Sequence, residues 1–303
     1  MIYRHFVYIK NKMVYASCFL MGGLGNQLFQ IFATIAYSIR TNRRIIFTYN
    51  ESLTTGTVRP TYWETFLMPL KFFTTLNYIY GLKNEDILHT FYRNNEVGFH
   101  YQEISDIDNK CNVILIGYYQ SYRYFIDYLP SILSMIKLNK QQESVKKEFN
   151  LLNTSVIITM HFRLGDYKNI QGFHPLMSLT YYENALSELI HIRGIENCPS
   201  VLYFCQEEDN AIVSEYICIL NKKWPGIVFN KVDDTIPDWK QMLIMSCCRD
   251  NIIANSTFSW WGAFLNQTSD KITFYPNEWF GPQLAKHNTS DLFPEDWKCI
   301  SVN

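Results

Sequence analysis

A run of strand-forming residues ends in three polar functional groups just past the middle of the chain. The run covers residues 156–160, and His161, Arg163 and Asp166 follow it closely. β-Branched and apolar residues of this kind favour a buried strand of a parallel sheet. Open α/β sheets bind ligands at the carboxyl ends of their strands, and an arginine there suits a multiply charged anion such as phosphate. The segment therefore predicts an α/β sheet with an anion site at its edge.

Two interpretations of this segment are open. In one, Arg163 binds phosphate and Asp166 orients Arg163. His161 then donates a hydrogen bond to the phosphate or to the nucleobase of the ligand. In the other, His161 is a core histidine and the other two residues form a surface ion pair. The crowding of three polar groups at the ligand end of one strand favours the first.

Strand-like and helix-like segments alternate along the chain. The 303 residues suffice for two domains of ordinary size, and the polar stretch 150–154 indicates a junction between domains at 1–150 and 151–303. Alternation favours right-handed crossovers and parallel sheets, so we expect an α/β protein of two Rossmann-like domains with a cleft between them. The expected strands cover 13–21, 45–47, 113–116, 155–161, 201–204, 227–229, 252–254 and 272–274, and the expected helices cover 26–40, 123–149, 179–192, 209–222, 237–248 and 258–266.

Composition narrows the range of partners and locations. Lys plus Arg is 27 and Asp plus Glu is 28, a net charge of -1, which gives no electrostatic case for nucleic acid as a partner. The 8 cysteines form no CxxC pair and no zinc spacing, and most lie in apolar runs, which indicates a reducing compartment. No stretch reaches the ~18 apolar residues of a membrane span, and residues 1–12 do not frame a signal-peptide core. We therefore expect a cytoplasmic protein with no transmembrane segment.

A glycine-rich turn, Gly22 to Gly25, separates the first expected strand from the helix at 26–40. Glycines permit tight turns and close backbone approach, and a helix start offers free N–H groups to an anion. The turn is not a P-loop, and it is not GxGxxG because Leu28 occupies the last position of that pattern. Turn chemistry alone favours a structural turn over a ligand loop.

The expected strand at 252–254 runs into the Asn-Ser-Thr sequence at 255–257 and then into an aromatic helix. Such side chains are good helix N-caps, so capping is one interpretation. The other is a second anion site, formed by hydroxyls and free N–H groups at the helix start. The adjacent Trp260 and Trp261 are more typical of a helix packed on a sheet than of a ligand stack.

Two acidic segments are weaker signals. Asp106 and Asp108 match a DxD pattern that can hold a divalent metal, but such short matches are common by chance and hard cations need several oxygen ligands. Residues 206–209, Gln-Glu-Glu-Asp, follow the expected strand at 201–204. They either present acceptors to a base or ribose, or begin the next helix with favourable negative charge.

Three segments together resemble the motifs of a known family. They are 22–30 (GGLGNQLFQ), 161–167 (HFRLGDY) and 255–263 (NSTFSWWGA). In this order, and spanning nearly the whole chain, they resemble the α-1,2-fucosyltransferases of glycosyltransferase family 11. The resemblance implies a GT-B-like fold and GDP-fucose as the donor, held mainly by the C-terminal domain. It also implies inversion at the fucose anomeric carbon, with no cofactor and no obligatory metal.

The resemblance further implies roles for individual residues. Arg163 and His161 would face the GDP pyrophosphate, and Arg163 would stabilise the charge that grows on the leaving phosphate. Asn26 would reach across the cleft, and Asp166 and His174 are the candidates for a general base. The predicted catalytic set is Arg163, Asp166 and His174. The predicted donor-binding set is Gly23, Gly25, Asn26, His161, Arg163, Glu207, Asn255, Ser256, Thr257 and Phe258, with no metal ligand.

Three departures from the family pattern concern guanine and ribose contacts more than pyrophosphate contacts. Leu164 stands where the family usually has a second arginine, and Gln206 and Gln241 stand where it usually has aspartates. Two alternatives stay open. One is a metal-dependent transferase that uses another nucleotide sugar with Asp106 and Asp108, and the other is a non-catalytic nucleotide or glycan binder.

For the acceptor, the resemblance points to the 2-hydroxyl of a terminal β-galactose in a surface glycan built at the inner face of the membrane. The N-terminal domain would hold this galactose-terminated oligosaccharide, with peripheral contact to a lipid-linked acceptor. Residues 50–110 are the expected source of linkage preference, through aromatic side chains that stack on a sugar, although most such aromatics pack cores. The candidates in this segment are Tyr62, Trp63, Phe91, Tyr92 and His100.

Overall fold

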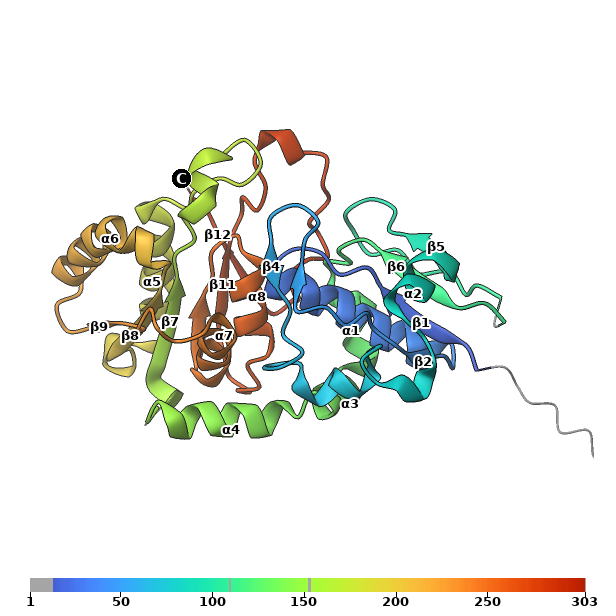
Figure 1. The fold of residues 1–303 in the computed structure, drawn as a ribbon. Coiled ribbons are helices and arrows are strands. Elements are labelled where there is room, and N and C mark those ends of the chain that lie inside the picture. The colour runs from blue at the N-terminus through green and yellow to red at the C-terminus, as the bar shows by residue number, and fades with distance from the viewer. Residues whose placement is uncertain (1–12, 109, 152–153, 303) are drawn as a thin grey trace, which may run out of the picture.

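The computed structural model describes residues 13–108, 110–151 and 154–302, which form two parallel β-sheets with helices packed on and between them (Figure 1). Residues 1–12, on which the signal-peptide expectation rests, lie outside the described residues, as do 152–153 of the predicted junction. Among the described helices, none combines the length and apolarity needed to cross a membrane.

The N-terminal sheet has four parallel strands in the order β2-β1-β6-β5. Its first strand leads through the glycine turn into helix α1, Leu24–Arg40, which is buried along most of its length because it packs on both the sheet and the C-terminal half. A separate antiparallel hairpin, β3-β4, lies beside α1 (Figure 1). The strands are β1 Tyr15–Cys18, β2 Arg44–Ile45, β3 Ser52–Leu53, β4 Arg59–Pro60, β5 Tyr92–Asn95 and β6 Val113–Ile116.

The C-terminal sheet has six parallel strands in the order β12-β11-β10-β7-β8-β9. The chain adds β8 and β9 on one side of β7 and then returns to add β10, β11 and β12 on the other. The strand order therefore reverses between β7 and β10, which is where open α/β sheets bind ligands. The strands are β7 Ile157–His161, β8 Ser200–Phe204, β9 Val228–Lys231, β10 Asp250–Ile252, β11 Thr273–Pro276 and β12 Lys298–Ile300.

Helices connect the strands of both sheets, as the alternating pattern predicted. The remaining α-helices are α2 Asn84–Thr90, α3 Leu129–Met135, α4 Leu138–Glu148, α5 Leu179–Arg193, α6 Asn210–Lys223, α7 Asp238–Cys247 and α8 Thr257–Phe264. Short 3₁₀ helices cover Met68–Phe73, Tyr78–Tyr80, Tyr122–Tyr124, Ile126–Tyr128, Thr154–Val156, Gly165–Asn169, Ile195–Asn197, Glu207–Asp209 and Pro282–Leu284.

The structure departs from the expected elements where the apolar residues show no clear helical or strand periodicity. The single helix expected at 123–149 is broken into α3 and α4 by Lys137, whose φ of 55° places it in the left-handed region. Strand β5, Tyr92–Asn95, was not expected, because its exposed polar residues give no alternation. The elements β3, β4, α2 and β12 were not expected either. The predicted α/β architecture of two Rossmann-like sheets facing a cleft is otherwise the one observed.

One apolar core runs across the two halves of the chain. Trp261 of α8 packs its indole 5.0 Å from the ring of Phe29 and 4.6 Å from that of Phe32, both on α1. Likewise Gln142 of α4 donates a hydrogen bond of 2.9 Å to the Ser246 hydroxyl of α7. The division predicted between residues 150 and 151 therefore stays a prediction. The sheets belong to separate segments, but their helices share a core.

Candidate active site

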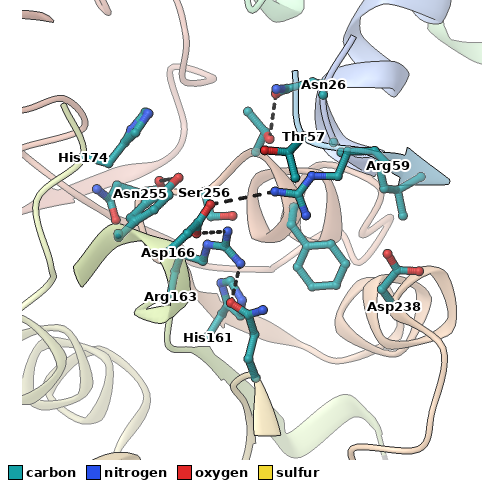
Figure 2. A pocket seen from close by; sticks show the side chains of 18 of the residues that line it. Asn26, Thr57, Arg59, His161, Arg163, Asp166, His174, Asp238, Asn255 and Ser256 are labelled. Carbon is teal, nitrogen blue, oxygen red and sulfur yellow. Dashed lines mark hydrogen bonds and ion pairs between the residues drawn. The ribbon is translucent and has the colours of Figure 1, made fainter. Parts of the chain in front are cut away.

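A cavity of about 1130 Å³ lies between the two halves of the chain. Its lining includes segments that follow the carboxyl ends of β1, β7, β8 and β10, and Figure 2 shows Asn26, Arg163 and Asn255 from three of these segments. Parallel strands of one sheet end at the same edge, so segments far apart in sequence meet there. Every residue of the predicted catalytic and donor-binding sets lines this cavity, although placement alone does not assign a role to any of them.

Arg163 is held in one orientation beyond the end of β7. Its Nη1 donates to Gln206 Oε1 at 2.7 Å and its Nη2 donates to Asp166 Oδ1 at 2.5 Å. The guanidinium also lies over the ring of Tyr167, 4.9 Å from the centroid. The Arg163 side chain remains 21% exposed, so an anion in the cavity can reach a guanidinium that is already fixed in place.

The loop that carries Asp166 is anchored by a buried carboxylate. Asp209 Oδ2 accepts from the backbone N–H of Gly165 at 2.8 Å, and its Oδ1 accepts from Lys168 Nζ at 2.6 Å. Gln206 and Asp209 come from the acidic segment after β8, so this segment supports the Arg163 loop. From the sequence, this segment was expected either to present hydrogen-bond acceptors to a base or ribose, or to begin the next helix. Nothing in the sequence indicated that it anchors the Arg163 loop.

His161, the last residue of β7, is buried and its Nδ1 has no hydrogen-bond partner among the described residues. Burial, together with the neighbouring Arg163 charge, lowers the pKa of His161 to about 3. The imidazole is therefore neutral near pH 7. It can exchange a hydrogen bond with a ligand but does not add a positive charge to the site. Its ring lies 5.5 Å from that of Phe258.

Two of the predicted ligand residues bind each other. Thr257 donates its hydroxyl proton to Asn26 Oδ1 at 2.9 Å, and Gln120 Nε2 donates to the same oxygen at 2.9 Å. The Trp261 indole N–H donates to the carbonyl of Gly25 at 2.8 Å. The glycine turn and the start of α8 therefore form a contact between the two halves as well as a wall of the cavity.

Asn255 and Ser256 differ in how their side chains are used. Asn255 Nδ2 donates to the carbonyls of Pro175 and Trp279, at 2.9 and 3.3 Å, which fixes the loops on either side. Asn255 Oδ1 is buried without a partner among the described residues. Ser256 is the N-cap residue of α8, but its side chain makes no capping hydrogen bond, so the simple capping interpretation does not describe it.

His174 and Glu207 line the cavity, whereas Leu164 does not. His174 stacks on Tyr167 with 4.7 Å between ring centroids, and burial is the main cause that lowers the pKa of His174. Glu207 is exposed at the cavity wall next to Gln206. Leu164 is buried in the apolar core of the C-terminal half.

Arg59 was not among the predicted site residues, and Tyr62 was named only as an aromatic candidate for stacking on the acceptor. Arg59 Nη2 lies 3.8 Å from Asp166 Oδ2, and Tyr62 donates its hydroxyl proton to Asp238 Oδ2 at 2.5 Å. Both contacts cross from the N-terminal half to the C-terminal half. The turn-like residues before Pro60 carry no helical or strand periodicity and no motif, so nothing in the sequence indicated that Arg59 lies beside Asp166.

The aromatic candidates of segment 50–110 mostly lie away from the cavity. Of the five named, Tyr62 alone lines it; Trp63 and Phe91 are buried in the core and Tyr92 is exposed elsewhere. Phe99, which was not singled out, lines the cavity instead, with its ring 4.9 Å from that of Phe280.

The Asp106–Asp108 segment lies outside the cavity lining. Asp106 faces Arg43 with 3.5 Å between Oδ1 and Nη1, and Arg43 Nη2 donates to the carbonyls of Ile107 and Asp108. Within the described residues, no group of three or more His, Cys, Asp or Glu side chains has a metal-binding arrangement. Only the Asp106 carboxylate faces Arg43, whereas Asp108 Oδ1 accepts from the backbone N–H of Lys110 at 3.0 Å. These contacts give the DxD interpretation no support.

Comparison with known proteins places the chain in a family. The model of glycosyl transferase family 11 matches residues 47–301. The chain belongs to this family. It is therefore a glycosyltransferase, as the three motifs predicted.

Two Escherichia coli proteins are similar to this chain, over different shares of its length. The alpha-1,2-colitosyltransferase is 28% identical over 296 residues, which cover 92% of this chain and 96% of that protein. The O-antigen biosynthesis glycosyltransferase WbnK is 26% identical over 201 residues, which cover 62% of this chain and 61% of WbnK.

A solved structure supports the fold. A mutant of Arabidopsis thaliana FUT1 in complex with GDP superposes with a TM-score of 0.51 at 9% sequence identity, over 93% of this chain and 75% of that one. Together with the two parallel sheets and the cavity between them, this confirms the predicted GT-B-like fold.

Proposed function

We propose that this chain transfers L-fucose from GDP-fucose to the 2-hydroxyl of a terminal β-galactoside, with inversion and without an obligatory metal. The observation that carries the proposal is the Arg163 guanidinium, held by Gln206 and Asp166 at the ligand edge of the C-terminal sheet. The motif resemblance suggests the donor and the acceptor, and membership of glycosyl transferase family 11 supports this choice.

In the proposed reaction, the bond between the fucose anomeric carbon and the phosphate oxygen breaks, and its electron pair stays on the β-phosphate. The acceptor oxygen bonds the opposite face of the same carbon and loses its proton. Arg163 stabilises the growing phosphate charge, and a preorganised donor of this kind is commonly worth about 10²–10³ in rate. His161 is neutral and its Nδ1 has no partner among the described residues, so in this proposal it adds a hydrogen bond to the phosphate or the nucleobase.

The proton of the acceptor goes to His174 or to the leaving phosphate itself. Asp166 Oδ1 accepts from Arg163 Nη2 at 2.5 Å, so the role of Asp166 in this proposal is to orient Arg163 rather than to accept the proton. The lowered pKa of His174 keeps its imidazole neutral near pH 7 and able to accept one.

The acceptor is proposed to be the terminus of a surface glycan, assembled in the cytoplasm at the inner face of the membrane. The name of WbnK, an O-antigen biosynthesis glycosyltransferase, favours such a glycan. Contact with a lipid-linked acceptor would then be peripheral. A second candidate function is transfer of colitose, because the alpha-1,2-colitosyltransferase matches 92% of this chain.

Calorimetry with GDP, UDP and ADP after exhaustive EDTA treatment tests the donor, and transfer to a β-galactoside in the same buffer tests the reaction. We expect GDP to bind most tightly and fucose to transfer without metal, because Arg163 and the start of α8 already supply positive potential. Activity that disappears with EDTA and returns with manganese would favour the metal-dependent alternative. Nucleotide binding with neither transfer nor donor hydrolysis would favour a non-catalytic binder, and transfer of colitose alone would favour the second candidate.

A further inference from the structure

Two guanidinium groups from opposite halves of the chain face one carboxylate. Asp166 Oδ1 accepts from Arg163 at 2.5 Å, and Oδ2 lies 3.8 Å from Nη2 of Arg59. Figure 2 shows Arg59 reaching from the N-terminal side toward Asp166 while Arg163 approaches the same carboxylate from the C-terminal side. The arrangement places two like charges in the cavity with a single carboxylate between them.

These two arginines are the permanent cations of the cavity. Among the described residues that line it, there is no lysine and no other arginine, whereas Asp166, Glu207, Asp234 and Asp238 bring carboxylates. A nucleoside diphosphate adds several negative charges to this space. Arg163 is already paired with a carboxylate, so its single positive charge does not balance the charges of the diphosphate. Electrostatic attraction therefore favours a contact between Arg59 and the ligand as well.

The two arginines are held very differently. Arg163 makes two hydrogen bonds and lies over the Tyr167 ring. The contact of Arg59 with Asp166 is an ion pair longer than a hydrogen bond. The Arg59 side chain is 39% exposed and that of Asp166 is 51% exposed, so solvent and ligands reach both. Arg59 is therefore the one that can change partner at little cost.

The backbone that carries Arg59 is nevertheless anchored. The buried Gln27 of α1 donates its Nε2 proton to the carbonyl of Pro60 at 2.9 Å. Two residues further on, Tyr62 is hydrogen-bonded to Asp238 across the cleft. A fixed Cα with a loosely held guanidinium lets the side chain move within the cavity while the hairpin stays in place.

We propose that Arg59 is a second diphosphate-binding residue, delivered from the N-terminal half, which exchanges Asp166 for the outer phosphate when the donor enters the cavity. Carboxylate and phosphate oxygens both accept the planar guanidinium fork, so Asp166 occupies in the free protein the kind of contact that the phosphate takes in the complex. Arg163 keeps its place, and the ligand then bridges both halves of the chain. The proposal rests on the proposed function, which supplies the diphosphate.

Calorimetry with GDP and GMP on the whole protein tests this assignment, using Arg59→Gln, Arg59→Lys and the control Arg93→Gln. Arg93 is an exposed arginine of β5 outside the cavity lining. Loss of one charge-assisted hydrogen bond predicts GDP affinity weaker by about 10- to 100-fold in Arg59→Gln. GMP, which lacks the outer phosphate, should change less than about threefold, and Arg59→Lys, which keeps the charge but loses the fork, should lie between.

Each result separates this proposal from the proposed function. Equal GDP affinities of Arg59→Gln and Arg93→Gln would overturn the role of Arg59 while leaving GDP as the donor. Equal losses for GDP and GMP would overturn the assignment to the outer phosphate. If the wild type prefers another nucleotide, the proposed donor is wrong, and the same comparison with that diphosphate and its monophosphate still decides the role of Arg59. A wild type that binds no diphosphate overturns both proposals.

Discussion

The hydroxyl of Thr257 donates a hydrogen bond of 2.9 Å to the side-chain oxygen of Asn26, so the first residue of α8 is joined to the first turn of α1. The backbones of α1 and α8 also approach each other closely at this point. A Cβ placed on Gly25 would lie 2.5 Å from the carbonyl carbon of Thr257, whereas one placed on Gly23 would meet nothing within 4 Å. The packing therefore requires a glycine at position 25 of the turn but not at position 23.

We expect Gly25→Ala to destabilise the protein and Gly23→Ala to leave its stability almost unchanged. The added methyl group of the first variant meets backbone that cannot rotate away, and overpacking of this kind typically costs about 1–3 kcal/mol. The second variant should change the free energy of unfolding by less than about 0.5 kcal/mol. Urea unfolding of both variants measures the difference. Equal stabilities would show that the two helices can separate slightly without penalty.

Arg163→Lys is expected to fold normally and to lose most transfer activity. A single ammonium group cannot reach both Gln206 and Asp166 as the guanidinium does, so the charge remains but its orientation is lost. We expect kcat/KM to fall by about 10²–10³, with kcat reduced as well as KM raised if the contact strengthens in the transition state. Steady-state kinetics beside Arg93→Lys measures this, and near-wild-type turnover of the Arg163 variant would remove Arg163 from the mechanism.

His161 should make the protein sensitive to acid. Its pKa falls from 6.5 in the unfolded chain to about 3 in the folded protein, so between these values the unfolded chain binds more protons. Stability from this group is therefore fully present above about pH 6.5 and is lost as the pH falls, by at most about 1.4 kcal/mol per pH unit.

The matched variant for this effect is His161→Gln, which keeps a polar side chain but does not titrate. Urea unfolding between about pH 7 and pH 5 should show a shallower decline for the variant than for the wild type. Parallel curves for the two proteins would mean that His161 is protonated in the folded state.

Phe99→Ala is expected to weaken acceptor use while sparing the nucleotide. Phe99 comes from the N-terminal half and meets Phe280 and His287 of the C-terminal half at 4.9 and 5.0 Å, all at the cavity wall. Loss of an aromatic face is worth about 0.5–1.5 kcal/mol, which predicts an acceptor KM about two- to tenfold higher.

The control for Phe99 is Phe72→Ala, an exposed phenylalanine that lines a different cavity. We expect its kinetics to match the wild type, and the GDP affinity of both variants to stay within about twofold. A Phe99 variant with weakened GDP binding and an unchanged acceptor KM would place the donor, rather than the acceptor, against this wall.

Local sequence determined the elements whose residues repeat with a clear period. The apolar run before His161 indicated a buried strand, and the apolar face of residues 26–40 indicated a helix, because the spacing of apolar residues along the chain reflects the backbone conformation. The three motifs indicated the family and the cavity-lining residues, because short segments at strand ends carry most of the polar groups of a parallel sheet.

Tertiary structure alone decided which of these polar groups use one another. Nothing local to residues 52–62 shows that Arg59 lies 3.8 Å from Asp166, or that Asn26 accepts from Thr257. Such pairs depend on how two sheets are oriented by a shared core, in which Trp261 packs against Phe29 and Phe32. Packing of this kind is a property of surfaces assembled from distant segments, and no window of sequence contains both sides of the contact.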